Sequence, residues 1–223
     1  MKEKSDPKLG ELIHELLLRK NIENPTIKSD ISPELKIKQL ETNFTNILSD
    51  LGLDLTNDSL SDTSLRVAKM FVNELFWGLD YTKFPKCTTV KNTIDYKSSF
   101  VMERNIAVRS TCEHHLVIID GSASLAYKPY NKTIGLSKLN RIVEFFAKRP
   151  QIQERLTEQI AETLSYVTDS PDVAVFIDAV HYCVKARGIQ DSQSSTITFA
   201  TRGMFSDFNS SLRKEFLDFA TLK

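Results

Sequence analysis

One short stretch limits what this chain can fold into, because it places a thiol and two imidazoles within four positions. The stretch is Cys112-Glu113-His114-His115, in a chain of 223 residues with three cysteines and four histidines. The spacing of Cys112 and His115 lets a sulfur and a ring nitrogen converge on one ion from a single turn, and His114 would then point elsewhere. Two ligands do not close a zinc site, so the fold must bring a partner from another part of the chain.

The candidate partner is the segment His181-Tyr182-Cys183. It ends a run from Asp172 to Val184 whose residues are mostly β-branched or aromatic. Counting by twos puts on one face of a strand Val173, Val175, Ile177, Ala179, His181 and Cys183. An apolar stripe therefore ends in an imidazole and a thiol, and a continuing strand would add Lys185 and Arg187 to the same face.

Three protein ligands, Cys112, His115 and Cys183, leave a fourth position for water. That is the pattern of a catalytic zinc site, whereas a structural site fills all four positions. Two further histidines of these segments, His114 and His181, become candidates for proton transfer.

Two plainer interpretations of these residues stay open. A buried cysteine is often a small hydrophobic residue, and a single histidine is often a satisfied polar one. A disulfide between Cys112 and Cys183 is the second, but the odd cysteine count and the lack of a secretory segment favour a reducing compartment, where thiols persist. Cys87 has no histidine or second cysteine near it in the sequence, so we expect it to be incidental.

The overall charge excludes some partners. The 29 basic and 29 acidic residues give a net charge of zero, so no global field attracts nucleic acid or a membrane, and any anion site must be local. The first ten residues are charged, and no apolar run approaches the length of a membrane span. We expect a cytoplasmic protein with a helical region over residues 1–80 and a catalytic domain over residues 81–223.

Hydrophobic periodicity and capping residues predict the elements. Helices are expected over residues 8–20, 32–51, 62–76, 137–149, 151–168 and 205–222, and strands over 100–109, 116–127, 172–184 and 195–202. The first pair of strands flanks the Cys112–His115 turn. The order of helices, two strands, two helices, two strands and a helix is an α+β plan.

The stretch Ile134–Arg141 suits a phosphate. Gly135 precedes a helix that Ser137 would cap, and Lys138 and Arg141 lie three residues apart in the first turns. Free backbone N–H groups, the helix dipole and the cations all favour an anion there.

Two other helix starts carry charged residues of interest. Arg66 lies in a first turn, against the helix dipole, which hints at an anionic partner, although a solvated arginine fits as well. Gln153 and Glu154 lie in the first turns of the helix over residues 151–168. A carboxylate there normally stabilises the dipole, but it could also accept paired hydrogen bonds from the N–H edge of a guanine.

Four motifs, in this order, carry a resemblance to a known family: Ser110-Thr-Cys-Glu-His-His, Ile134-Gly-Leu-Ser-Lys-Leu-Asn-Arg, Arg149-Pro-Gln-Ile-Gln-Glu-Arg-Leu and Val180-His-Tyr-Cys-Val-Lys-Ala-Arg-Gly. From about Pro33 to about Thr201 the chain resembles bacterial GTP cyclohydrolase I. The resemblance implies the tunnelling fold, in which antiparallel β-hairpins of several subunits form a barrel with helices packed outside. It also implies a homodecamer of two stacked pentamers, with active sites between subunits.

The resemblance implies a role for each candidate residue. The zinc ligands would be Cys112, His115 and Cys183, and the bound water would attack C8 of the guanine of GTP. His181 would protonate the imidazole ring nitrogen of the base, and His114 would serve later proton transfers near the ribose and triphosphate. The triphosphate pocket would be lined by Arg66, Ser137, Lys138, Arg141, Lys185 and Arg187. Guanine recognition would fall to Gln153 and Glu154, and the products would be formate and 7,8-dihydroneopterin triphosphate, the entry to folate synthesis.

The sequence departs from that family in places, and three other functions are alternatives. Ser64-Leu65 stands where members often have Pro-His, and residues before Ile31 and after Gly203 match loosely. A purine deaminase would need a Cys-x-x-Cys pair that is absent here. A structural zinc protein would need neither extra histidine nor the cations. A nitrile-reducing relative would need a nucleophilic cysteine, and only Cys87, outside the cluster, is left over.

Overall fold

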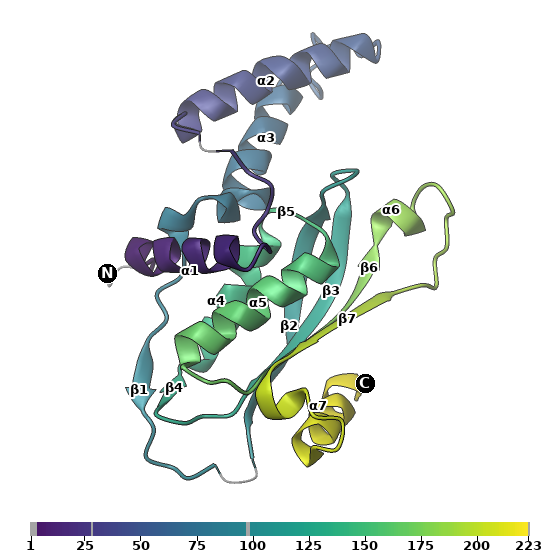
Figure 1. Ribbon diagram of the computed structural model, residues 1–223. Helices are drawn as coiled ribbons and strands as arrows, with labels where there is room; N and C mark the ends of the chain where they lie inside the picture. The colour runs from purple at the N-terminus through teal and green to yellow at the C-terminus, as the bar shows by residue number, and fades with distance from the viewer. Residues whose placement is uncertain (1–3, 28, 97–98, 223) are drawn as a thin grey trace.

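The computed structural model describes residues 4–27, 29–96 and 99–222 (Figure 1). Its helices are α1 (Pro7–Arg19), α2 (Pro33–Asp50), α3 (Thr63–Met70), α4 (Leu136–Ala147), α5 (Gln153–Thr168), α6 (Tyr182–Lys185) and α7 (Ser211–Thr221). Its strands are β1 (Thr89–Lys91), β2 (Val101–Cys112), β3 (Ile118–Tyr127), β4 (Lys132–Ile134), β5 (Pro150–Gln151), β6 (Val173–His181) and β7 (Thr196–Thr201).

The main sheet has the strand order β5-β2-β3-β6-β7. The pairs β2–β3, β3–β6 and β6–β7 are antiparallel, whereas β5 runs parallel to the end of β2. β1 and β4 form a separate two-stranded ribbon. Helices and an antiparallel sheet in this order confirm the predicted α+β plan, with β2–β3 and β6–β7 as its two hairpins.

Helices α4 and α5 cover one face of the sheet (Figure 1), and the main core lies between them. It includes the fully buried Val108, Leu125, Phe146, Ile160 and Val175. On the opposite face α7 covers one end of the sheet with a smaller cluster around Phe176, Phe205, Leu212 and Phe216. Because both faces are covered there, β6 is buried along most of its length.

The N-terminal helix α1 belongs to the main core. Ile13 and Leu17 are fully buried, and the Asp6 side chain caps the helix by accepting from Leu9 N at 3.1 Å. His14 stacks on Tyr81 with ring centroids 4.5 Å apart.

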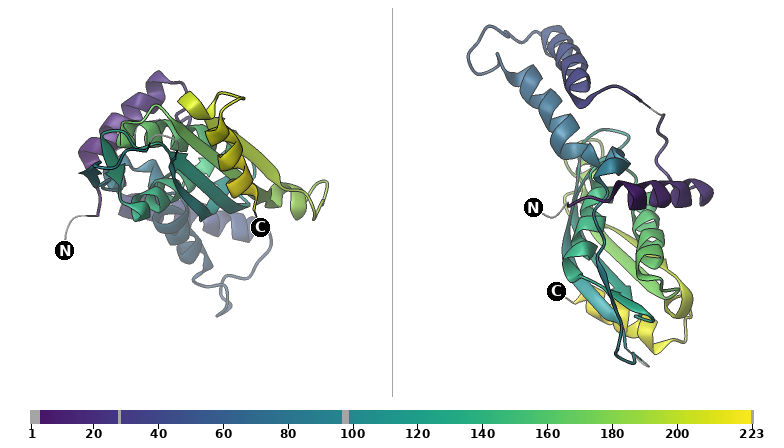
Figure 2. Two further views of the ribbon diagram at one scale, coloured as in Figure 1. Left: turned by 90° about the horizontal axis from the view of Figure 1, so that it is seen from below. Right: turned by 90° about the vertical axis from the view of Figure 1, so that its left-hand side faces the viewer.

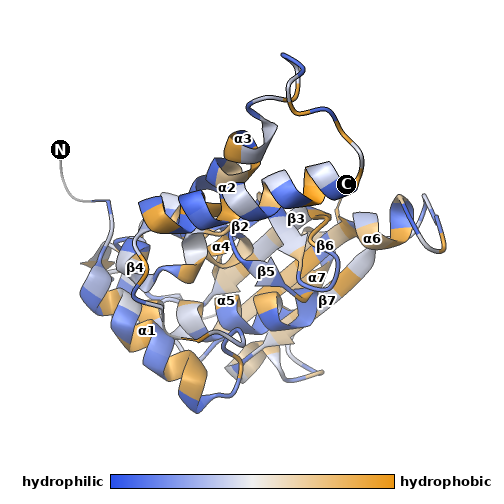
Figure 3. Ribbon diagram, turned by 90° about the horizontal axis from the view of Figure 1, so that it is seen from above, coloured by the Kyte–Doolittle hydropathy of each residue, from blue (hydrophilic) through white to orange (hydrophobic). Residues whose placement is uncertain are grey.

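Helices α2 and α3 form an arm that projects from the sheet (Figures 1 and 2). No residue of α2, all of which are described, is buried, and in α3 the buried residues are Ser64 and Ala68. The ring of Phe44 meets that of Phe71 at 5.1 Å. Apolar and polar segments alternate along α1 and α2 (Figure 3), the pattern of amphipathic helices, so the arm presents apolar side chains such as Ile47 and Leu51 to solvent.

Two local predictions were wrong. The N-cap of α4 is Gly135, so Ser137 lies inside the first turn, and the Ser137 side chain makes no capping hydrogen bond. β6 ends at His181, and Cys183 and Lys185 lie in the helical turn α6. The strand stops there because pairing with β7 ends at Ala179 and pairing with β3 ends at His181, which leaves no ladder partner beyond.

In the described part of the chain no helix combines the length and apolar character that crossing a bilayer requires.

Candidate metal centre

The turn between β2 and β3 holds the first two candidate ligands. Cys112 N–H donates to Val117 O at 2.8 Å, and Leu116 N–H donates to Cys112 O at 2.9 Å. Leu116 adopts a φ of 53°, in the left-handed region that a branched side chain adopts only at a cost. The backbone is therefore folded back tightly, and Glu113, His114 and His115 project from a closed turn.

The strand β5 supports the same turn from the other side. Gln151 pairs with Cys112, and Glu113 N–H donates to Gln151 O at 3.0 Å. The Arg155 guanidinium donates from Nη2 to the Glu113 carboxylate, and its Nε lies 3.4 Å from Gln151 Oε1. Sequence reasoning missed Glu113, Gln151 and Arg155, although they stand in the Ser110–His115 and Arg149–Leu156 motifs.

Cys112, His115 and Cys183 come together as predicted. Their ligand atoms all lie within 4.8 Å of one another, and Cys112 Sγ is 4.0 Å from His115 Nδ1. In a tetrahedral zinc site such atoms lie roughly 3.6–3.8 Å apart, so the group needs only a small closure. Two thiols and an imidazole are donors suited to zinc. All three cysteines of the chain are free thiols, which contradicts the disulfide alternative.

The raised pKa of the Cys183 thiol bears on how this group would bind a metal ion. Burial raises the pKa of the Cys183 thiol, the neighbouring Cys112 raises it further, and Arg187 lowers it. A ligating cysteine must be a thiolate, so metal binding here releases a proton and its affinity depends on pH.

His114 and His181 flank the candidate ligands in the chain. His181 Nε2 is 2.7 Å from Gln153 Oε1, and burial lowers the pKa of His181 while the Glu154 carboxylate raises it. His114 does not point away as expected: its Nδ1 is 4.0 Å from Cys112 Sγ. Its Nε2 lies 3.9 Å from Glu113 Oε1, and its side chain is exposed.

The predicted anion-binding residues divide into three places. Lys185 and Arg187 follow β6, close in sequence to the candidate ligand Cys183. Ser137 and Lys138 lie in the first turn of α4 and Arg141 near its middle, and the 12 residues of the helix span about 18 Å before the chain reaches β5. There burial raises the pKa of the Cys87 thiol to about 12, and the charges of Lys138 and Arg141 lower it.

Arg66 lies in the third place, on the projecting arm. Its Nη2 is 3.3 Å from the Asp62 carboxylate, and both side chains are largely exposed. One chain therefore does not gather all the candidate cations around Cys112 and Cys183.

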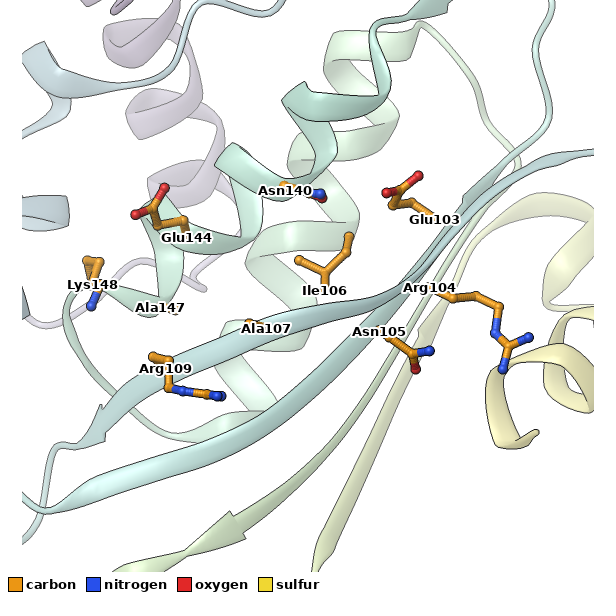
Figure 4. Close-up of a pocket in the computed structure, with 10 residues that line it drawn as sticks. All are labelled: Glu103, Arg104, Asn105, Ile106, Ala107, Arg109, Asn140, Glu144, Ala147 and Lys148. Atoms are coloured by element: carbon orange, nitrogen blue, oxygen red, sulfur yellow. The ribbon is translucent and has the colours of Figure 1, made fainter. Parts of the chain in front are cut away.

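A pocket of about 430 Å³ lies between the outer edge of β2 and α4 (Figure 4). Its charged lining includes Glu103, Arg109, Glu144 and Lys148, and none of the metal ligands lines it. The metal-ligand turn lies instead at the open end of the sheet, where His115 is exposed.

A second polar cluster lies behind β5 and is closed to solvent. Arg149 is fully buried, and its Nη1 donates to Glu23 Oε1 at 3.0 Å, to Asn24 Oδ1 at 3.2 Å and to Tyr81 Oη at 3.2 Å. The guanidinium lies 4.8–4.9 Å from the ring centroids of Tyr81, Phe145 and Phe146.

The same cluster attaches the segment after α1 to β5. The Tyr81 hydroxyl donates to the Glu23 carboxylate, and Asn24 Nδ2 donates to Pro150 O at 2.7 Å. Gln159 Nε2 donates to Ile22 O at 2.8 Å. Residues 22–24, which lie between the helices predicted over residues 8–20 and 32–51, are therefore fixed against the strand that supports the turn with Cys112 and His115.

A family model described as GTP cyclohydrolase I matches residues 40–221, so the match continues well beyond Gly203, where the sequence was expected to fit loosely. A GTP cyclohydrolase 1 of Yersinia enterocolitica is 49% identical over 210 residues, covering 94% of each chain. One of Vibrio campbellii is 51% identical over 208 residues, covering 93% of this chain and 95% of its own. Among solved structures, an apo archaeosine synthase QueF-Like aligns with 47% of this chain and 94% of its own, at 17% identity and a TM-score of 0.40.

Proposed function

The chain belongs to the GTP cyclohydrolase I family, and from this premise we propose that it hydrolyses GTP to formate and 7,8-dihydroneopterin triphosphate, in the cytoplasm. The observation that carries the proposal is the Cys112, His115 and Cys183 group with His181 beside it. A donor set of two thiols and an imidazole fits zinc and leaves a coordination position open. Three free thiols fit a reducing compartment.

Cys112, His115 and Cys183 would hold the ion. A zinc ion bound there would supply a water of lowered pKa, the nucleophile that attack at C8 of guanine needs at neutral pH. Glu113 and Arg155 would keep the ligand turn in position. Lys185, the last residue of α6, and Arg187 just after it would contribute positive charge for the triphosphate.

His181 would exchange the proton of the imidazole ring nitrogen of guanine, and His114 would act in the later steps. Burial lowers the pKa of His181 and the Glu154 carboxylate raises it, and the neutral ring has one basic nitrogen available. Glu154 is exposed beside His181, and its carboxylate could accept two hydrogen bonds from the N–H edge of guanine. A carboxylate that accepts these two hydrogen bonds from guanine would discriminate strongly against adenine.

The triphosphate would be bound by cations from more than one chain. Ser137 and Lys138 lie in the first turn of α4, Arg141 lies near the middle of that helix, and Arg66 lies on the arm. We therefore propose an active site between subunits, with these residues coming from neighbouring copies. Over Val101–Ser110, the outer edge of β2 has no strand partner among the described residues, which supports pairing of hairpins from several copies into the barrel of a tunnelling-fold decamer.

The organisation of the chain follows from the same proposal. Residues 81–223 would form the tunnelling-fold catalytic domain, and residues 1–80 the helical region that includes the projecting arm. An assembly of this kind can be tested by mixing two inactive variants, Cys183→Ala and Arg141→Ala. Shared sites would recover a fraction of the activity in mixed oligomers, whereas sites built within one chain would recover none.

The test of the function is formate release and pterin absorbance from purified protein given GTP, with a chelator and with zinc added back. Zinc-dependent release of both products supports the proposal. Binding of GTP without release, in zinc-loaded protein, would instead favour a zinc protein that has lost catalysis.

The variant His181→Ala tests the proton-transfer role of His181. It should keep its zinc and lose about 10²- to 10⁴-fold in rate, the usual contribution of a general acid or base. Zinc content is measured on the same sample as formate release. A His181→Ala protein with undiminished formate release would contradict the role of His181.

A further inference from the structure

The side-chain amide of Gln153 has only one possible orientation. Gln153 is 1% exposed, and one of its amide atoms lies 2.8 Å from Thr196 O and 3.2 Å from Ile177 O. Backbone carbonyls only accept hydrogen bonds, so the atom between them must be the NH₂ group. The other amide atom, which faces His181, is therefore the carbonyl oxygen.

Two threonines support this orientation independently. Thr157 Oγ1 donates its single hydrogen to Gln153 O at 2.8 Å. The Thr198 hydroxyl, 2.6 Å from Thr157 Oγ1, must then donate to it, which leaves Thr198 Oγ1 to accept from Gln153 Nε2 at 3.1 Å. Each donor in this circuit is assigned, and reversing the amide would oppose acceptor to acceptor.

The orientation of the amide decides where the proton of His181 lies. Gln153 Oε1 is 2.7 Å from His181 Nε2, and a carbonyl oxygen can only accept, so Nε2 carries a hydrogen. In a neutral imidazole the other nitrogen, Nδ1, is then unprotonated. Gln153 is the only hydrogen-bond partner of this ring within residues 4–27, 29–96 and 99–222.

We propose that Gln153 is a positioning residue: it holds His181 as the Nε2–H tautomer and leaves Nδ1 as the ring nitrogen available to the substrate. The proposal rests on the GTP hydrolysis proposed above and concerns the same site. It differs from the guanine contact that the family resemblance implies for Gln153, because both ends of this amide already bind the protein. The base would then be contacted by the exposed Glu154.

A double-mutant cycle separates the two roles. Gln153→Met, which keeps the volume, should lower kcat roughly 10- to 100-fold, the effect of removing the partner that orients a histidine, and leave the affinity for GTP nearly unchanged. In a His181→Ala background the same substitution should cost no further rate, because Gln153 acts through that ring. A direct guanine contact predicts weakened GTP binding and an equal loss in both backgrounds, which would overturn the proposal.

Nitrogen-15 spectra of histidine-labelled, zinc-loaded protein without GTP test the tautomer directly. The wild-type His181 signals, identified by their loss in His181→Ala, should show a protonated Nε2 and an unprotonated Nδ1, and Gln153→Met should shift the ring toward the other tautomer. Gln159→Met is the matched control, because Gln159 is a fully buried glutamine of the same helix that does not contact His181.

The spectra decide the proposal even if the activity proves different. A wild-type ring protonated at Nδ1, or a Gln153→Met spectrum identical to the wild type, would overturn it. If the wild-type protein does not hydrolyse GTP, the proposed function fails, and the tautomer is still determined by the spectra.

Discussion

On one side of β5 lie Cys112, His115 and Cys183, whose ligand atoms face one another at an open end of the sheet. On the other side lies Arg149, which is fully buried and has its charge met by Glu23 and three aromatic rings. Both clusters are polar and both touch the same two-residue strand. The open one leaves donor atoms for an ion to bind, whereas the closed one pairs its buried charge with a carboxylate inside the protein.

The difference shows how a reactive cluster can be held without being closed. Pro150 O accepts from Asn24 in the closed cluster, and the next carbonyl, Gln151 O, accepts from Glu113 in the open one. The closed cluster therefore fixes the backbone on which the metal-ligand turn depends. Each variant below changes one of the two clusters, and its effect on zinc binding, rate or stability shows what that cluster contributes.

The largest effect is expected for Cys183→Ala, which removes a ligand from the open cluster only. The variant should lose its zinc and drop in rate by roughly 10⁴-fold or more, because the metal lowers the pKa of water from 15.7 to about 7. Thermal unfolding of the variant should match that of metal-free wild-type protein. Metal analysis that finds stoichiometric zinc in the variant would remove Cys183 from the ligand set.

Arg149→Ala tests the closed cluster. Breaking a buried ion pair leaves Glu23 uncompensated, so the free energy of unfolding should fall by about 3–5 kcal/mol. Urea unfolding measures this loss. The matched control is Arg109→Ala, since Arg109 forms an exposed pair with Asp120 and its removal should cost no more than about 1 kcal/mol. Equal losses in the two variants would mean that the Arg149 cluster adds nothing beyond a surface pair.

Arg155→Met tests the support of the open cluster. Without the bond to the Glu113 carboxylate the ligand turn is less well oriented, so zinc affinity should fall about 10- to 100-fold, as for other groups that orient ligands. Competition with a chelator measures the affinity. Stability should change little, because Glu113 is half-buried and can be hydrated. An unchanged zinc affinity would show that β5 alone holds the turn.

Tyr81→Phe should have the smallest effect. It removes the hydroxyl that donates to Glu23 and accepts from Arg149, at a cost of about 1–2 kcal/mol near neutral pH. Burial raises the pKa of Tyr81, the charge of Arg149 lowers it, and Glu23 raises it.

The pH dependence of that loss has a definite sign. Below about pH 10 the phenol is protonated in both states; above it the unfolded chain ionises while the folded one does not, so wild-type stability falls as pH rises. The difference between wild type and Tyr81→Phe should therefore shrink above about pH 10. Unfolding measured across that range checks it, and a constant difference would contradict the raised pKa.

The sequence predicted the open cluster better than the closed one, for a physical reason. Cys112 and His115 are three residues apart, and period-two spacing led from Val173 to His181, so local patterns contained the information. Arg149 and Glu23 are 126 positions apart, and no local pattern connects them. Burial of an arginine is decided by what packs around it, and the sequence offered only a polar stretch.

The ends of helices and strands were also predicted poorly from the sequence. The strand leading to Cys183 was predicted too long, because its end depends on where β3 and β7 stop pairing. Ser137 has good N-cap chemistry, yet α4 begins at Leu136 after the turn that joins it to β4. Propensity identifies the elements, and neighbouring strands set their bounds.

The bond from Asn24 to Pro150 also bears on the order of folding. It closes a loop of 126 positions, and such long closures are costly until other contacts hold the ends near each other. During synthesis, residues 22–24 leave the ribosome long before α5 exists, so α1 cannot dock at its final site until the sheet has formed. Closure of the Arg149 cluster should then be a late event, and the metal-ligand turn should gain its support at the same step.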